Sequence, residues 1–420
     1  MSRFDVLRLP AFRLFFVAQL GSALGDFMVA PALAFAILDR TGSPGDIGLV
    51  LAARTIPVVL FMLLGGVVAD RWPRHRVMFG ADAVRVVSQG ITAALVLSGD
   101  ARIWQLMALQ AVHGTASALF TPAVTGLVGQ VVDAERRHSA NALRSMTHSA
   151  AMITGPLLST LLIVTVGSGW AIAADAATFA VSAFCLARIH LPPTPARPTD
   201  ARNMLVELKL GWREFRSRTW VWSVILMASL TNMMYAVFTV LGPVLSKREL
   251  GSPGAWGAIL AAFGLGAVTG SASALWLRVR HPLRTGVLSL TLFAAPPLVM
   301  SATDSAVIAG AAAFLGGMAL MFFNPLWETT LQKEIPGDKL SRVSAYEWFG
   351  SYAAQPVGLA LAGPVAAATS VRFTLFAAGA TQLVVCLATL AGRDVRAYRA
   401  ADHQAEGADH QTEGRERTTQ

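Results

Sequence analysis

The sequence predicts an all-α membrane protein with twelve transmembrane helices, arranged as two parallel-repeat six-helix bundles. Three observations lead to this fold class. Hydrophobic residues make up 54% of the 420 residues and charged residues only 14%, against about 25% charged in soluble globular domains. The apolar residues gather in runs of about 20, the length of a bilayer-spanning helix. The runs of the first half of the chain recur in the second half.

The twelve apolar runs follow one another along most of the chain. They do not alternate as the strands of a membrane β-barrel do, and the first is too long for a cleaved signal peptide. They lie at about 11–38, 45–68, 76–98, 102–130, 138–165, 168–189, 219–246, 253–277, 283–302, 305–332, 339–367 and 371–392.

Basic residues predict the orientation of these spans. Most Lys and Arg residues fall in alternate connections, and the opposite connections hold Arg40, Arg102, Lys247, Arg248 and Arg372. Positive charge concentrates on the cytoplasmic side, so both termini are expected in the cytoplasm, in an inner or plasma membrane. The net charge of +9 therefore indicates membrane topology and not nucleic-acid binding.

Local repeats indicate that the two halves are copies in the same orientation. Gly42-Ser43-Pro44-Gly45 recurs as Gly251-Ser252-Pro253-Gly254, each copy opening the second span of its half. We predict an N-terminal bundle at 1–189, a cytoplasmic linker with an amphipathic interfacial helix at 190–218, a C-terminal bundle at 219–392 and a disordered cytoplasmic tail at 393–420. Such a layout is typical of secondary transporters with a site between the bundles.

The connection between the second and third spans carries the most specific motif. It reads Gly66-Val-Val-Ala-Asp70-Arg71-Trp-Pro-Arg74-His-Arg76 and resembles the signature loop G-x-x-x-D-R-x-G-R-[RK] of the major facilitator superfamily. The resemblance implies a conformational latch formed by Gly66, Asp70, Arg71, Arg74 and Arg76. The second-half copy has Val279 in place of the aspartate, so the latch is expected to be asymmetric.

A second motif indicates the direction of transport. Gly155-Pro156 in the fifth span resembles the kink of the antiporter motif g-x-x-x-G-P-x-x-G-G and favours export. Together with Leu24-Gly25-Asp26, Asp82-x-x-Arg85 and Ala140-Asn141-Ala142-Leu143, it resembles the macrolide-efflux and enterobactin-exporter branch of that superfamily.

Charged residues inside spans are the first functional candidates, because they are costly there. Asp26 lies about 22 Å from the inner end of the first span, and Arg54 about 13 Å from the outer end of the second. These depths agree across a core of about 30 Å, so the two are predicted to pair and to couple transport to protons. A purely structural ion pair is the alternative.

Other charges within spans are assigned mainly structural roles. Asp82 and Arg85 are predicted to form a structural or coupling pair linked to the Asp70 loop. Glu328 and Glu347 are expected to pair with nearby Arg or Lys, or to form a second latch. Asp175 is expected to face the outer vestibule.

The substrate cavity follows from the resemblance, which implies that the first and fourth helices of each half line it. Amide and aromatic side chains dominate there and favour a mid-sized amphipathic molecule, antibiotic-like or siderophore-like. The candidates are Gln19, His113, Phe120, Asn232, Tyr235, Phe322, Asn324 and Trp327.

These observations predict a proton-coupled exporter that works by alternating access. Its partners would be a small-molecule substrate, protons and the lipid bilayer, with no nucleic acid, and the chain would act as a monomer. We expect no cofactor, no metal and no catalytic residue, since the sequence lacks G-x-x-x-x-G-K-[ST], H-E-x-x-H and G-x-S-x-G. A small-metabolite importer and a non-transporting membrane scaffold remain the alternatives.

Overall fold

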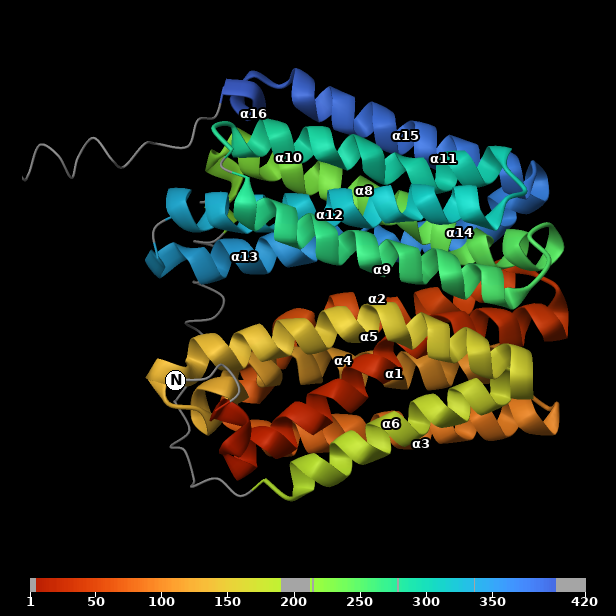
Figure 1. Cartoon of the computed structure of the whole chain (residues 1–420), viewed down its shortest axis with the longest axis horizontal. Coiled ribbons are helices and arrows are strands. Elements are labelled where there is room, and N and C mark those ends of the chain that lie inside the picture. Colours follow the sequence, from red (N-terminus) through yellow and green to blue (C-terminus); the bar gives the residue numbers. More distant parts are fainter. Residues whose placement is uncertain (1–4, 190–211, 214, 278, 336, 398–420) are drawn as a thin grey trace, which may run out of the picture.

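The computed structural model describes residues 5–189, 212–213, 215–277, 279–335 and 337–397, and most of them are helical (Figure 1). In the first half, six long helices follow a short 3-10 helix, η1 (Asp5–Arg8), and a second one, η2 (Ala134–Arg136), precedes the fifth. The long helices are α1 (Pro10–Thr41), α2 (Pro44–Arg71), α3 (Arg74–Ser98), α4 (Ile103–Val131), α5 (Arg137–Val166) and α6 (Ser168–Ala187).

The second half repeats this order with more interruptions. Its elements are α8 (Thr219–Arg248), α9 (Pro253–Trp276), α10 (Pro282–Leu290), η3 (Thr291–Ala294), α11 (Ala295–Ala302), α12 (Ala306–Glu334), α13 (Gly337–Tyr352), α14 (Gln355–Ala368), α15 (Val371–Ala391) and α16 (Arg393–Ala397). In the described part of the chain, 11 helical segments are long and apolar enough to cross a membrane, with α10 to α11 counted as one segment. The helical membrane fold predicted from sequence is thus confirmed.

Two spans that the sequence predicts as continuous are interrupted by proline. A proline ring clashes with the carbonyl group four residues earlier and removes a backbone N–H. For Pro296 and Pro297 those carbonyls belong to residues 292 and 293, which lie in the 3-10 turn η3. For Pro356 the carbonyl belongs to Tyr352, the last residue of α13. The ninth span is therefore built from α10 and α11 with η3 between them, and the eleventh from α13 and α14.

The repeated Gly-Ser-Pro-Gly segments form the same turn in both halves. Gly42 and Gly251 have φ angles of 67° and 86°, a left-handed conformation that glycine adopts without strain. Pro44 and Pro253 then begin α2 and α9, where a missing N–H costs nothing. The sequence repeat is therefore also a structural repeat.

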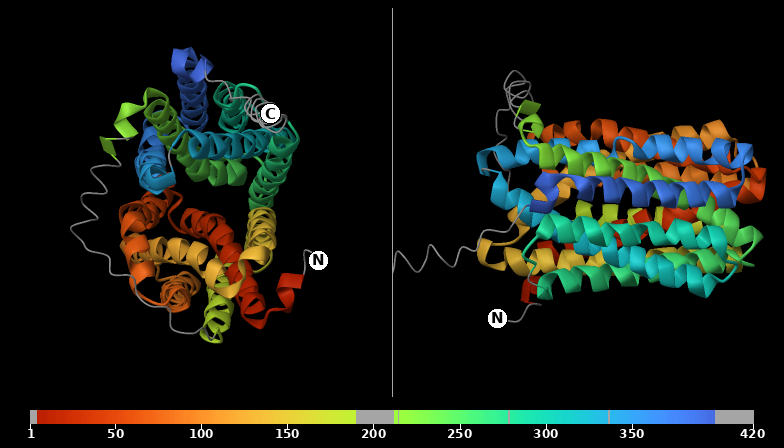
Figure 2. Two further views of the ribbon diagram at one scale, coloured as in Figure 1. Left: turned by 90° about the vertical axis from the view of Figure 1, so that its left-hand side faces the viewer. Right: turned by 90° about the horizontal axis from the view of Figure 1, so that it is seen from above.

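The two halves form separate bundles that lie side by side (Figures 1 and 2). They are in close contact at the end that carries the α1–α2 and α8–α9 turns, which we call the closed end. A β-carbon on Gly48 of α2 would lie 2.1 Å from the carbonyl oxygen of Leu359 in α14, and one on Gly257 of α9 would lie 1.9 Å from Thr160 Oγ1 in α5. Absent side chains thus let the helix pairs α2–α14 and α5–α9 approach closely.

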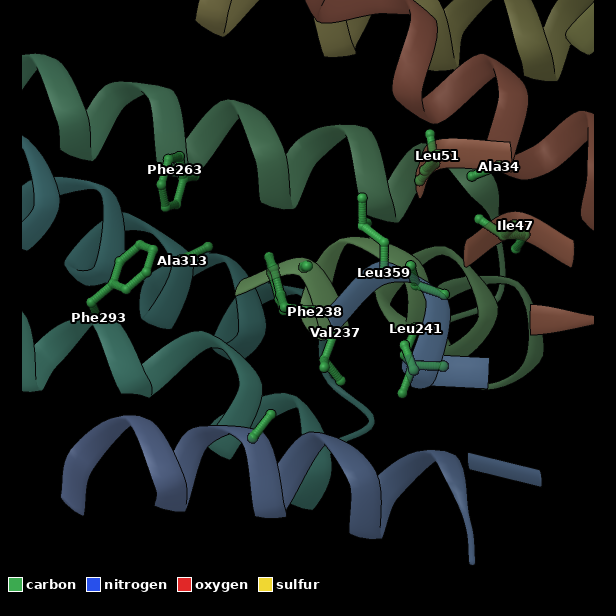
Figure 3. Packing of buried hydrophobic residues seen from close by; sticks show 14 of the residues in the cluster. Ala34, Ile47, Leu51, Val237, Phe238, Leu241, Phe263, Phe293, Ala313 and Leu359 are labelled. Atoms are coloured by element: carbon green, nitrogen blue, oxygen red, sulfur yellow. The ribbon is translucent and has the colours of Figure 1, made fainter. Parts of the chain in front are cut away.

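Apolar packing continues across this contact. One buried cluster includes Ile47 and Leu51 of α2 together with Leu241 of α8 and Leu359 of α14 (Figure 3). An exposed ion pair between Asp39 and Lys247 also joins the halves at the closed end. The predicted linker helix lies mostly outside the described residues, because 190–211 are not described. The first residues of the tail that we predict as disordered form the short helix α16 (Arg393–Ala397), and the rest of the tail lies outside the described residues.

Candidate functional site: a charged cluster inside the first bundle

The structure places Asp26 of α1 beside Arg54 of α2. Arg54 Nη2 donates a hydrogen bond to Asp26 Oδ1 at 3.0 Å. The Asp26 side chain is 37% exposed and that of Arg54 16%, so the pair is reachable from outside the protein interior. An ion pair with one partly open carboxylate is able to exchange a proton or a ligand, unlike a fully sealed one.

Arg85 of α3 connects this pair to a second aspartate. Its Nη1 lies 3.2 Å from Asp82 Oδ1 and 3.9 Å from Asp26 Oδ2. It also donates a hydrogen bond to Ser22 Oγ at 3.0 Å. The Asp82–Arg85 pair is therefore linked to Asp26. The side chains of Asp70 and Arg71 lie outside the described residues, so the predicted link to the Asp70 loop stays a prediction.

Aromatic rings and a hydroxyl group enclose the guanidinium and carboxylate groups of this second pair. The guanidinium carbon of Arg85 lies 4.6 Å from the ring centre of Phe120 and 5.1 Å from that of Phe179. Ser182 of α6 donates a hydrogen bond to Asp82 Oδ2. Both charged side chains are almost completely buried, at 1% and 0% exposure, so their pairing offsets a large desolvation cost.

A third aspartate completes the cluster, and no described arginine forms an ion pair with it. Asp175 of α6 is fully buried, which corrects the expectation that it faces the outer vestibule. Its Oδ2 accepts a hydrogen bond from Gln89, and Gln89 in turn accepts one from Gln110 at 2.8 Å. The other carboxylate oxygen, Oδ1, has no hydrogen-bond partner among the described residues.

Three carboxyl groups in this cluster thus face two guanidinium groups. We expect Asp175→Asn to leave the melting temperature of the purified protein unchanged or higher, because it removes the carboxylate that lacks an arginine and keeps an oxygen for Gln89. Asp82→Asn should instead destabilise the fold by about 3–5 kcal/mol, as removal of one partner from a buried pair does. Thermal unfolding in detergent measures both. A larger loss for Asp175→Asn than for Asp82→Asn would contradict this charge balance.

The histidine predicted to line the cavity is part of this interior. His113 of α4 is fully buried, and its ring packs edge-on to Phe179 at 5.5 Å. Neither ring nitrogen has a hydrogen-bond partner in the described part of the chain. His113 and Phe120 therefore belong to the packing around Arg85 and Asp175.

The signature loop is only partly described. The side chains of Gly66, Asp70 and Arg71 lie outside the described residues, although α2 continues to Arg71. Arg74 reaches α4, where a β-carbon on Gly126 would lie 1.9 Å from its Nη1. Arg76 is exposed. Arg74, the first arginine after the turn, thus packs against α4 at Gly126, where there is no side chain in the way.

The Gly155-Pro156 pair lies at a contact within the first bundle. Pro156 lies inside α5, which the structure shows as one helix. A β-carbon on Gly155 would lie 2.6 Å from the β-carbon of Phe27 in α1. Next to it, Ser159 donates a hydrogen bond to the carbonyl oxygen of Met28 at 2.8 Å. This segment therefore positions α1, the helix that carries Asp26.

The residues predicted for the substrate cavity do not all lie together. Asn232, Asn324 and Trp327 line a cavity of about 270 Å³ in the second bundle. Tyr235 instead packs against the rings of Phe238, Phe263 and Phe293. Phe322 and Gln19 do not line this cavity either; its phenylalanine is the neighbouring Phe323.

Sequence reasoning missed the polar residues that extend the cluster, namely Gln89, Gln110, Ser22 and Ser182. Each is uncharged and common, so nothing marks it out in the sequence. The available signal is periodicity: Asp82, Arg85 and Gln89 are spaced three and four apart, which places them on one face of α3.

Comparison with known proteins places this fold and cluster in a family. The sequence profile of the major facilitator superfamily matches residues 15–359. The chain belongs to the major facilitator superfamily, and it is a multi-pass membrane transporter of a small-molecule substrate. The resemblance noted in the signature loop is confirmed.

Two groups of relatives are similar over nearly the whole chain. The enterobactin exporter EntS of Escherichia coli O1:K1 is 26% identical over 389 residues, covering 90% of this chain and 92% of that protein. The multidrug efflux pump Tap of Mycobacterium bovis BCG is 25% identical over 393 residues, covering 88% and 90%. Both relatives carry names of exporters.

Solved structures show the same fold. The nucleoside transporter NupG superposes with a TM-score of 0.72 at 12% identity, covering 91% of this chain and 99% of that one. An auto-inhibited peptide transporter of the POT family also gives 0.72, at 13% identity, covering 94% and 98%. At these identities the likeness concerns the fold alone.

Proposed function

We propose that this chain is a proton-coupled exporter of an amphipathic small molecule that works by alternating access. The observation that carries the proposal is the close contact that described residues of the two bundles make at the closed end. At the closed end α2 meets α14 and α5 meets α9 through glycine contacts, whereas the cavity of the second bundle lies toward the opposite end. A site open toward one side at a time is what alternating access requires.

The orientation and direction of this cycle follow from two further arguments. With both termini in the cytoplasm, as the basic residues favour, the closed end faces outward and the cavity inward. An inward-facing site accepts substrate from the cytoplasm, which is the loading step of export. The relatives named as exporters, EntS and Tap, support the same direction.

Proton coupling is assigned to Asp26 and Arg54. A proton on Asp26 would neutralise the carboxylate that Arg54 and Arg85 share and would weaken both contacts. Since Asp26, Arg54 and Arg85 lie on three different helices, this change alters how α1, α2 and α3 hold one another. We infer that protonation and substrate occupancy alternate through this change.

The latch is assigned to Gly66, Asp70, Arg71, Arg74 and Arg76. It lies at the opposite end of α2 from the closed end, where the halves must come together when the transporter opens outward. The contact of Arg74 with Gly126 of α4 gives the loop a fixed point within its own bundle. Its acidic and basic groups would then stabilise one of the two facing states.

An importer is the competing function, and accumulation in cells separates the two. Cells lacking other pumps are loaded with macrolide-like, siderophore-like and cationic dye compounds. Expression of the chain should lower the accumulation of at least one compound, and a protonophore should restore it. Cells expressing Asp26→Asn at the same level provide the control. Higher accumulation that the protonophore abolishes would identify an importer, and no change across the panel would reject transport of this substrate class.

A further inference from the structure

A cavity in the second bundle carries two carboxyl groups among its described lining residues. It has a volume of about 270 Å³ and lies between α8, α12 and α13, away from the closed end. Glu328 enters it from α12 and Glu347 from α13. Among the described residues that line it there is no Lys, Arg or His. The ionisable groups that line the described part of this cavity are therefore all carboxyl groups or the phenol of Tyr352.

The sequence predicts basic partners or a second latch for these glutamates, and two of the nearby basic residues, Lys339 and Arg342, have side chains outside the described residues. In the part of the chain that the structure describes, neither Glu328 nor Glu347 forms an ion pair with Lys or Arg. Glu347 Oε1 accepts a hydrogen bond from Trp327 Nε1 at 3.2 Å. One neutral hydrogen bond holds this carboxylate in place without balancing its charge.

Aromatic rings line the same cavity beside the two carboxyl groups. Trp348 and Tyr352, one turn apart on α13, stack with ring centres 5.7 Å apart and planes inclined by 8°. Trp327 stacks on Phe323 at 6.2 Å. Indole and phenol rings present negative faces that attract organic cations. Carboxylates and aromatic faces together are the groups that a substituted ammonium ion prefers.

An unused hydroxyl group points to a ligand independently. Thr231 of α8 lines the cavity, is only 3% exposed, and its hydroxyl oxygen has no hydrogen-bond partner in the described residues. Buried polar atoms in folded proteins nearly always have a partner. A bound molecule with a polar group beside α8 would supply one.

From these observations we propose that this cavity binds an organic cation, with its charge at Glu328 and Glu347 and its apolar part against Trp327, Trp348 and Tyr352. Carboxylates that no described basic side chain opposes are poorly compensated in a partly desolvated site, and a bound cation removes that cost. The volume is near the lower end for small-molecule pockets, so a protonated arylalkylamine or a quaternary ammonium ion with one aromatic ring is the fitting size. The claim that organic cations are substrates rests on the proposed export function. The claim that the cavity binds them does not.

The test measures binding to the purified full-length protein in detergent by isothermal titration calorimetry. Benzyltrimethylammonium is the probe, because its charge does not depend on pH. Neutral 2-phenylethanol and anionic phenylacetate are comparable in size. The cation should bind at least tenfold more tightly than either, and Glu328→Gln with Glu347→Gln should remove that preference. Glutamine keeps an oxygen for the Trp327 hydrogen bond, so the fold should be retained, which thermal unfolding checks.

Glu334→Gln is the matched control, since Glu334 lies on α12 six residues from Glu328 and does not line the cavity. This variant should bind the cation as the unsubstituted protein does. Equal affinities for the three probes, or an unchanged cation preference in the double variant, would overturn the proposal. Cation binding without export from cells would overturn the proposed function and leave the site standing. Export of neutral compounds without cation binding would overturn the cation site and leave the proposed export function standing.

Discussion

Asp26→Asn is expected to abolish proton-driven transport while leaving the protein folded and inserted. The amide keeps a hydrogen-bond acceptor for Arg54, whose Nη2 lies 3.0 Å from the Asp26 carboxylate, but it takes up no proton. Transport driven by a pH gradient in reconstituted vesicles should therefore fall to the level of protein-free vesicles. Exchange of labelled for unlabelled substrate without a gradient should continue, because it requires no net proton movement.

The two assays together distinguish coupling from a purely structural ion pair. A structural pair predicts that Asp26→Asn lowers the melting temperature and impairs both transport and exchange. Asp100→Asn, in the exposed turn between α3 and α4, provides a matched change of charge and should behave as the unsubstituted protein. Gradient-driven transport at the unsubstituted rate in Asp26→Asn would remove Asp26 from the coupling mechanism.

Gly48→Leu is expected to prevent the halves from meeting at the closed end. Even a β-carbon at this position would lie 2.1 Å from the carbonyl oxygen of Leu359, a backbone atom that is unable to move aside alone. Overpacking of a close contact costs about 1–3 kcal/mol, which is roughly fivefold to 150-fold in population. The state closed at this end should become the minor one, and transport should fall with it.

Spin labels on the two sides of the closed end measure this shift. Labels in the α1–α2 and α14–α15 turns should report longer distances in Gly48→Leu. Gly80→Leu is the control, because a β-carbon on Gly80 of α3 meets nothing within 4 Å. Unchanged distance distributions in Gly48→Leu would show that α2 and α14 do not need this contact to close.

Much of the fold can be predicted from the sequence, because the length of each span and the repeated turns can be read directly from consecutive residues. The rise of a helix is uniform, so residue counting alone brings Asp26 and Arg54 to the same depth. The repeated Gly-Ser-Pro-Gly turn fixes the boundary between the first and second spans of each half. The breaks at Pro296 and Pro356 were in principle readable, since proline disturbs the turn before it.

The side-chain contacts between helices could not be predicted from the sequence, because they depend on how each helix is rotated about its axis. Arg85 could pair with Asp82 on its own helix, but its contact with Asp26 requires α1 and α3 to turn these faces toward each other. The sequence predicts a basic partner or a second latch for Glu347, and the structure places its carboxyl group at the cavity beside Trp327. The helix that carries Glu347 ends at Tyr352, before the break in this span. A continuous helix through the span therefore does not predict where the Glu347 side chain points.

The most direct test of a proton-coupled exporter is the direction in which a pH gradient moves its substrate. The compound most affected in the cell panel is added outside proteoliposomes whose interior is acidic, and then outside ones whose interior is alkaline, with protein-free liposomes as the blank. Antiport predicts accumulation only with the acidic interior, whichever way the protein is inserted, and its loss in Asp26→Asn. Accumulation only with the alkaline interior would identify proton symport and contradict the account.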